Sequence, residues 1–104
     1  MSLNYVVLSG SLGFDSEIRY TSAGKPVLEF SLTVTDSQSP EFQHAVRVIG
    51  RRDHAAELHS QLKKGSQVIV EGQLVQRTLE TGVGYRRKQP EINMDHLTVL
   101  NQPN

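Results

Sequence analysis

Apolar and polar residues alternate along much of the chain, as they do in strands that bury one face. The clearest case is residues 27–35, where every second residue from Leu28 to Val34 is apolar and the residues between are polar. This period of two is typical of a half-buried antiparallel strand. The same reasoning predicts further extended segments at residues 4–12, 18–21, 44–50, 67–79 and 85–100.

One segment has helical spacing instead. Asp53 is a good N-cap residue, and Ala55, Leu58 and Leu62 follow it at intervals that place them on one side of a helix. Gly65 suits the C′ position, where a left-handed residue ends a helix. We therefore expect one helix of about ten residues, which ends within a residue or two of Gly65.

Glycine and proline mark the points at which the strands turn. Residues 22–26 form a predicted turn, because Gly24 can adopt positive φ and Pro26 has no N–H to donate to a sheet. Residues 81–84 are a predicted hairpin tip. Gly72 lies inside a long predicted strand, where glycine indicates a bend or a bulge.

The order of these elements favours an all-β fold. Counting the short 18–21 piece with its neighbour, the order is three strands, one helix and two strands. This is the order of the OB-fold, a five-stranded Greek-key barrel with one α-helix between strands 3 and 4. An SH3-like barrel or a small α+β sandwich would also use such elements, but the single helix after the third strand argues for the OB-fold. With 104 residues and 37% hydrophobic residues, we expect a single domain over residues 1–104.

Composition excludes several classes of protein. There is no cysteine, so disulfide frameworks, thiolate catalysis and cysteine-based zinc sites are excluded. No apolar run approaches the ~18 residues of a membrane helix, and there is no secretory leader. We therefore expect a cytoplasmic protein with no membrane partner.

Zero net charge conceals an uneven distribution. Residues 1–41 hold two basic and five acidic residues, residues 42–88 hold nine basic and four acidic, and residues 89–104 hold two acidic residues. A polyanion could bind the central region if the fold gathers its basic residues on one face. Otherwise these charges belong to ordinary solvated surfaces.

The sequence gives little support for an enzyme. His54 and His59 are five residues apart, about 140° around a helix, so they do not share a metal-binding face. The Gly24-Lys25 pair is followed by proline and lacks the upstream glycine of a phosphate-binding loop. We expect no enzyme activity, no cofactor and no metal.

The basic residues of the central region, residues 42–88, fit nucleic-acid binding better than catalysis. In an OB-fold the second and third strands and the loop between strands 4 and 5 border one groove. Basic residues there would attract phosphates, and aromatic rings would stack on bases. The predicted DNA-binding residues are Arg19, Tyr20, Lys25, Phe42, His44, Arg47, Arg51, Arg52, Arg77, Tyr85, Arg86, Arg87 and Lys88. Tyr85 and Phe42 could equally be packing residues, and we assign Phe14 and Phe30 to the core.

Several segments of the chain follow the pattern of a known family. They are Asn4-x-Val6-x-Leu8-x-Gly10-x-Leu12-Gly13, then residues 17–34, and then residues 48–50, 56–57 and 62–74. Together they resemble the bacterial single-stranded DNA-binding protein family. The resemblance extends from about residue 4 to residue 100. It implies an OB-fold, a homo-oligomer and non-specific binding of single-stranded DNA in replication, recombination or repair, without metal or catalysis.

The chain departs from the family's pattern in two respects. The family's stacking aromatics are replaced, in our alignment, by Gln38, Gln43, Ile49 and Leu79, so arginine would contribute more. The family has an acidic-tipped C-terminal tail, and we expect none here because the chain stops at Asn104. In this respect, and over residues 19–28, the chain is similar to primosomal replication protein N, a dimeric relative that acts in replication restart.

These observations lead to three hypotheses about partners. The first is a module for single-stranded DNA that forms a dimer or a tetramer and works with replication or restart proteins such as a helicase. The second is an OB-fold adaptor that binds proteins of a primosome or replisome and holds nucleic acid weakly. The third is an RNA-binding OB-fold.

Overall fold

Six strands and one helix make up the computed structural model, which describes residues 2–35, 38–39, 41–50, 55–80, 82, 84 and 86–101. The elements are β1 (Val6–Leu12), β2 (Glu17–Tyr20), β3 (Pro26–Thr35), β4 (Gln43–Gly50), α1 (Ala55–Gln61), β5 (Gln67–Glu80) and β6 (Arg86–Asn101). Every predicted strand is present, with ends that differ by at most two residues. The predicted N-cap Asp53 lies outside the described residues.

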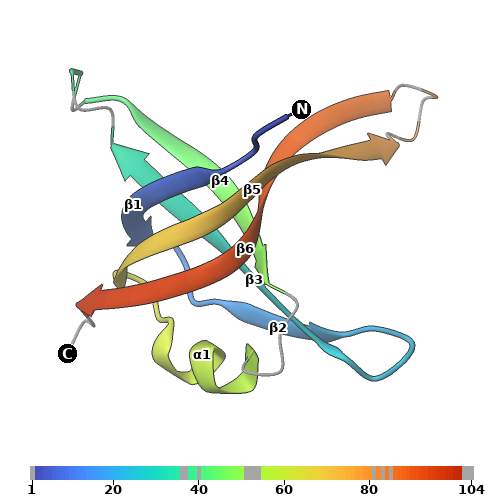
Figure 1. Cartoon of the computed structure of the whole chain (residues 1–104), viewed down its shortest axis with the longest axis horizontal. Coiled ribbons are helices and arrows are strands. Elements are labelled where there is room, and N and C mark those ends of the chain that lie inside the picture. The colour runs from blue at the N-terminus through green and yellow to red at the C-terminus, as the bar shows by residue number, and fades with distance from the viewer. Residues whose placement is uncertain are drawn as a thin grey trace.

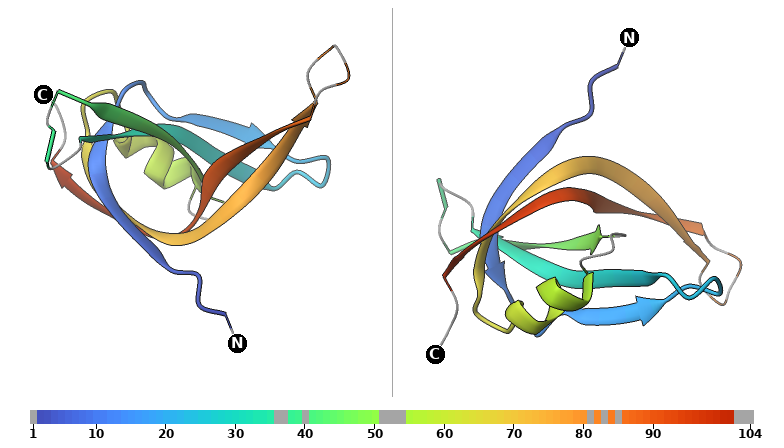
Figure 2. Two further views of the ribbon diagram at one scale, coloured as in Figure 1. Left: turned by 90° about the horizontal axis from the view of Figure 1, so that it is seen from above. Right: turned by 60° about the horizontal axis from the view of Figure 1, so that its bottom comes forward.

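The strands close into a barrel. The order β1-β5-β6-β4-β3 returns to β1, because Ser11 and Leu12 of β1 pair with Thr33 and Leu32 of β3. All these pairs are antiparallel except β4 with β6. The predicted OB-fold is therefore confirmed, and the views in Figures 1 and 2 show the closed barrel. The short β2 is the predicted 18–21 piece and pairs with β3, so the helix falls between β4 and β5 in this numbering.

A bend in β5 and β6 occurs at Gly72, as predicted. The β5–β6 register shifts between Glu71 and Gly72, which is the signature of a bulge. A Cβ atom at Gly72 would lie 2.2 Å from the backbone oxygen of Asn93, so only glycine fits this close approach. Beyond the bend the two strands continue as a long hairpin that projects from the barrel (Figure 1).

The core of the barrel consists of the apolar side chains that face inward on the alternating strands. Leu28, Phe30 and Leu32 of β3 are at most 5% exposed, as their alternation predicts. The other buried apolar residues of the core are Leu12, Val48, Leu62, Val68, Val70, Ile92 and Met94. Phe14 was assigned to the core wrongly, because it lies in the loop after β1 and is 72% exposed.

Helix α1 covers one end of the barrel (Figure 2) and is shorter than predicted. It ends at Gln61, four residues before Gly65, so the predicted end was wrong. Tertiary contacts explain the difference. Leu62 is fully buried in the core, and the N–H of Gly65 donates to the carbonyl of Leu12 at 2.8 Å. Gly65 does have positive φ, 90°, but it serves a turn toward β1 rather than the cap of the helix.

One buried polar contact attaches α1 to the segment before β2. The hydroxyl of Ser16, which is 3% exposed, lies 2.9 Å from Nδ1 of His59. His59 thus packs against the segment before β2, and His54 lies outside the described residues. In the part of the chain that the structure describes, α1 is far too short to span a bilayer.

Candidate nucleic-acid interface

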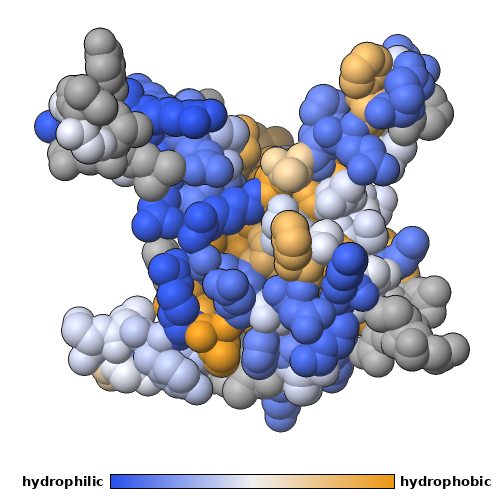
Figure 3. Space-filling model, turned by 180° about the vertical axis from the view of Figure 1, so that it is seen from behind, coloured by the Kyte–Doolittle hydropathy of each residue, from blue (hydrophilic) through white to orange (hydrophobic). Residues whose placement is uncertain are grey.

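A groove of about 490 Å³ lies between two hairpins of the barrel. One wall is the end of the β2–β3 hairpin, with Tyr20 and Val27, and the other is β5, with Val75 and Arg77. Tyr20 is 66% exposed and Val75 is 39% exposed, so the ring of Tyr20 and the methyl groups of Val75 are accessible. Seen from behind, the molecule has many hydrophilic side chains with a hydrophobic strip among them near the centre of this view (Figure 3).

Two buried carboxylates form part of the floor of this groove. Glu29 of β3 is 8% exposed and Glu91 of β6 is 3% exposed. They flank β4, whose Ile49 also lines the groove and pairs with Glu29 in the sheet. Charged side chains are almost never buried without partners, so the surroundings of these two groups decide what the groove can bind.

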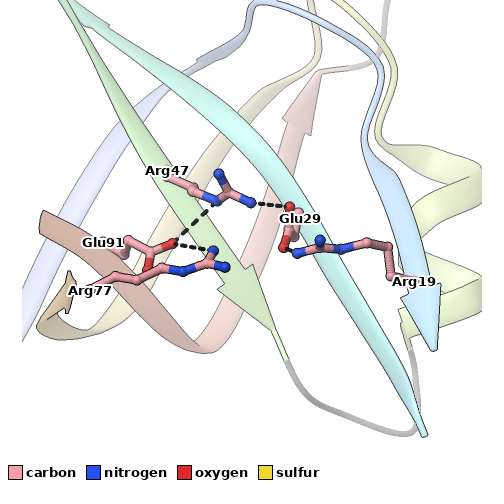
Figure 4. Close-up of polar contacts among 5 residues, drawn as sticks. All are labelled: Arg19, Glu29, Arg47, Arg77 and Glu91. Carbon is pink, nitrogen blue, oxygen red and sulfur yellow. Dashed lines mark hydrogen bonds and ion pairs between the residues drawn. The ribbon is translucent and has the colours of Figure 1, made fainter. Parts of the chain in front are cut away.

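Three arginines and these two glutamates form a continuous ladder across the sheet (Figure 4). Arg19 pairs with Glu29, and Nη2 of Arg47 donates to Oε2 of Glu29 at 2.6 Å. On its other side, Nε of Arg47 lies 3.2 Å from Oε2 of Glu91. Nη1 of Arg77 lies 3.9 Å from the same oxygen. Arg47 therefore bridges both carboxylates, while Arg19 and Arg77 each end the ladder on a different wall.

The structure brings four of the predicted residues together. Arg19, Tyr20 and Arg77 line the groove, and Arg47 joins the two acids of its floor. Lys25 is exposed in the turn beside them, where its N–H donates to the hydroxyl of Thr21 at 3.2 Å. The predicted residues Arg51, Arg52 and Tyr85 lie outside the described residues.

Phe42 and His44 are exposed at the far end of β4. His44 precedes Ile49 by five residues, which is about 16 Å along an extended strand. Neither residue lines the groove between the hairpins. By the alternation of side chains along β4, His44 lies on the face of Val46 and Val48, whereas Ile49 lies on the other face, which meets the groove.

The basic residues after the hairpin tip point to two different sides. Arg77 pairs with Gln89 in the β5–β6 ladder, and directly opposite residues share a face. Successive residues alternate between faces, so Arg87 lies on the side of Arg77 and the groove. Arg86 and Lys88 lie on the other side. A cluster that is continuous in the sequence is thus divided by the strand.

The two floor glutamates were missed by sequence reasoning. The alternation placed Glu29 on the polar face of its strand, and Glu91 entered only the charge count. The one available signal was an acid on one predicted strand beside arginine on the next, which becomes meaningful only with the register. In the described part of the chain, no group of three His, Asp or Glu side chains could hold a metal ion.

Comparison with known proteins agrees with this geometry. The model of the single-strand binding protein family matches residues 3–100. The chain belongs to this family. It is 33% identical to a single-stranded DNA-binding protein of Mycobacterium leprae over 100 residues, which cover 88% of the chain and 60% of that relative. It is 36% identical to a single-stranded DNA-binding protein of Thermotoga maritima over 98 residues, which cover 86% of the chain and 67% of that relative.

A solved structure has the same architecture. The Plasmodium falciparum family member in complex with single-stranded DNA superimposes with a TM-score of 0.82 at 26% identity. The match covers 97% of each chain. The two chains therefore share one fold over nearly their whole length, whereas this chain spans about three fifths of the Mycobacterium leprae relative.

Proposed function

We propose that this protein binds single-stranded DNA without sequence preference, in replication or replication restart, through the groove between the β2–β3 and β5–β6 hairpins. The observation that carries the proposal is the pair of half-exposed arginines, Arg19 and Arg77, on opposite walls of one groove. Phosphates attract such walls through charge alone, and unpaired bases can contact the apolar surface between them. The family membership and the DNA-bound Plasmodium falciparum relative support the same ligand.

Further residues extend the proposed path. Lys25 and Arg87 add positive charge to the two rims, and Tyr20 offers a ring for stacking. Five further predicted contacts stay predictions: Phe42, His44, Arg51, Arg52 and Tyr85. Arg86 and Lys88 lie on the other side of the hairpin and are not placed on this path. Because few aromatics are available, we expect charge to supply most of the affinity.

The direct test is a titration of fluorescently labelled oligo(dT) followed by anisotropy. We expect tight binding at low salt that weakens steeply as salt rises, because each phosphate contact releases counterions. Competition with poly(U) distinguishes DNA from RNA binding. Absence of binding to oligo(dT) at low salt would refute the proposal.

The alternating faces of β6 allow a matched pair of variants. Arg87→Ala should reduce the slope of log K against log salt by about 0.7, the value for one contact to a single strand. Arg86→Ala, one residue away and also exposed, should change the slope less because Arg86 points away from the groove. Equal effects of the two substitutions would mean that the strand does not follow the groove face of the hairpin.

We further propose that the chain forms a homo-oligomer, a dimer or a tetramer. Residues Val6–Gly10 of β1 pair with β5 along one edge, and no strand of the described residues pairs with their other edge. A free edge is a template for pairing with another chain. Tyr5 and Val7 beside it are more than half exposed.

Partial desolvation and the Glu71 carboxylate, to which the Tyr5 hydroxyl donates a hydrogen bond, raise the pKa of Tyr5 above its usual 10.0.

Light scattering in solution tests this part of the proposal. We expect a mass of at least twice 11.6 kDa at micromolar concentration. Substitution of the exposed Val7 by lysine should shift the population toward monomer, since like charges would face each other across a symmetric edge. A monomeric wild-type protein would contradict the proposed oligomer and leave DNA binding untouched.

A second candidate function is an adaptor for replication or restart proteins. It is favoured by the ladder itself, since all three groove arginines already have acidic partners. A protein that binds a purified replication helicase but no oligonucleotide would support the adaptor. Binding of oligo(dT) by the isolated protein supports the first proposal instead.

A further inference from the structure

We infer that Glu29 and Glu91 compete with DNA phosphates for the arginines of the groove and so set its affinity and its salt dependence. This inference rests on the proposed binding of single-stranded DNA. It concerns the two buried glutamates, which no motif or resemblance marked as part of the binding surface.

The charges of the ladder nearly cancel. Three guanidinium groups share two carboxylates, so the floor offers a phosphate chain a net charge of only one. Arg47 contacts both acids and its side chain is 34% exposed, which makes it the least available of the three. Arg19 and Arg77 have 55% and 43% of their side chains exposed, so they can turn toward a strand that lies above them.

When Arg19 or Arg77 turns toward a bound strand, a buried glutamate loses part of its compensating positive charge. The side chain of Glu91 is 4% exposed, and among the described residues its Oε2 accepts no hydrogen bond although two guanidinium groups face it. Within that part of the chain, charge attraction from these arginines compensates this oxygen. A phosphate that draws Arg77 away leaves Glu91 with weaker compensation in a buried place, which is unfavourable.

The same acids repel phosphates that approach the floor. Like charges brought together at an interface oppose binding. The apolar side chains of Val27, Ile49 and Val75 lie in the same groove. The geometry therefore keeps phosphates on the arginine-bearing rims and turns the bases toward the floor.

Removal of either negative charge should strengthen binding. In Glu91→Gln and in Glu29→Gln, we expect affinity for oligo(dT) at 50 mM salt to rise by about threefold to tenfold. The salt slope should become steeper by about 0.7, because one arginine is released to contact a phosphate. Glu57→Gln is the matched control, since Glu57 is exposed on α1 and is remote from the groove.

The outcomes are separable. Thermal unfolding of each variant first identifies those that remain folded at the temperature of the titration, and Glu29→Gln decides the matter if Glu91→Gln does not fold. If the glutamates served only to stabilise the fold, folded variants would bind with unchanged or lower affinity and slope, which would overturn the inference. Wild-type binding with no gain in the variants refutes this inference alone. Failure of the wild type to bind oligo(dT) refutes the proposed function, and this inference with it.

Discussion

Replacement of Arg47 by alanine is expected to lower the free energy of unfolding by about 3 kcal/mol. The reason is that Arg47 bridges Glu29 and Glu91, whose side chains are 10% and 4% exposed. Without it, two carboxylates remain buried, and of their partners in the described residues Arg19 and Arg77 are left at the margins. The loss is placed at the low end for a broken buried pair because the guanidinium itself is about one third exposed. Urea unfolding with an unchanged m-value measures it.

The controls for this prediction lie in the same chain. Arg87→Ala removes an exposed guanidinium from the hairpin and should change stability by less than about 0.5 kcal/mol. Glu91→Gln introduced into the Arg47→Ala variant should restore part of the loss, since one uncompensated charge disappears. An Arg47→Ala protein as stable as the wild type would show that the floor acids do not depend on this bridge.

Replacement of Gly72 by alanine should cost a similar amount, about 3 kcal/mol. Its Cβ atom would lie 2.2 Å from the oxygen and 3.0 Å from the carbonyl carbon of Asn93. Both atoms belong to the backbone of β6, so no flexible side chain can move aside. The two strands would have to separate at the bulge, which holds the hairpin that carries Val75 and Arg77 over the groove. We therefore expect weaker oligo(dT) binding as well as a lower unfolding midpoint.

Gly82→Ala is the control for a glycine that no contact requires. No atom lies within 4 Å of its added Cβ, and its φ is not positive. Stability should change by less than about 0.5 kcal/mol. If Gly72→Ala were equally mild, the close approach of β5 to β6 at the bulge would not be essential to the barrel.

Local patterns were sufficient wherever the immediate neighbours of a residue decide its structure. The alternation from Leu28 to Val34 predicted a strand whose apolar residues fill the core, and Phe30 is buried there. Gly72 predicted the bulge. The same reasoning failed for Phe14, which sits in a loop where periodicity carries no information. It also failed for the end of the helix, because a contact between Gly65 and the distant Leu12 ends the helical path early.

For the proposed binding surface, too, the sequence predicted some features and the tertiary structure decided others. The basic centre of the chain and the order of its elements predicted a groove with arginines, and Arg19 and Arg77 do meet there from segments almost sixty residues apart. The charge count added Arg86, Arg87 and Lys88 to one basic central region, whereas the strand register separates them onto two faces. The same count included Glu29 and Glu91 only as separate negative charges.

The amino-acid sequence by itself determined the strands, their order and hence the barrel, because hydrophobic periodicity and glycine act within a few residues. Only the tertiary structure decided which charges cancel. Glu29, Arg47 and Glu91 come from three different strands, and each acid becomes buried and paired only when the sheet closes and sets their register. Burial and pairing are properties of that closed sheet, so they determine how strongly the groove can attract a polyanion.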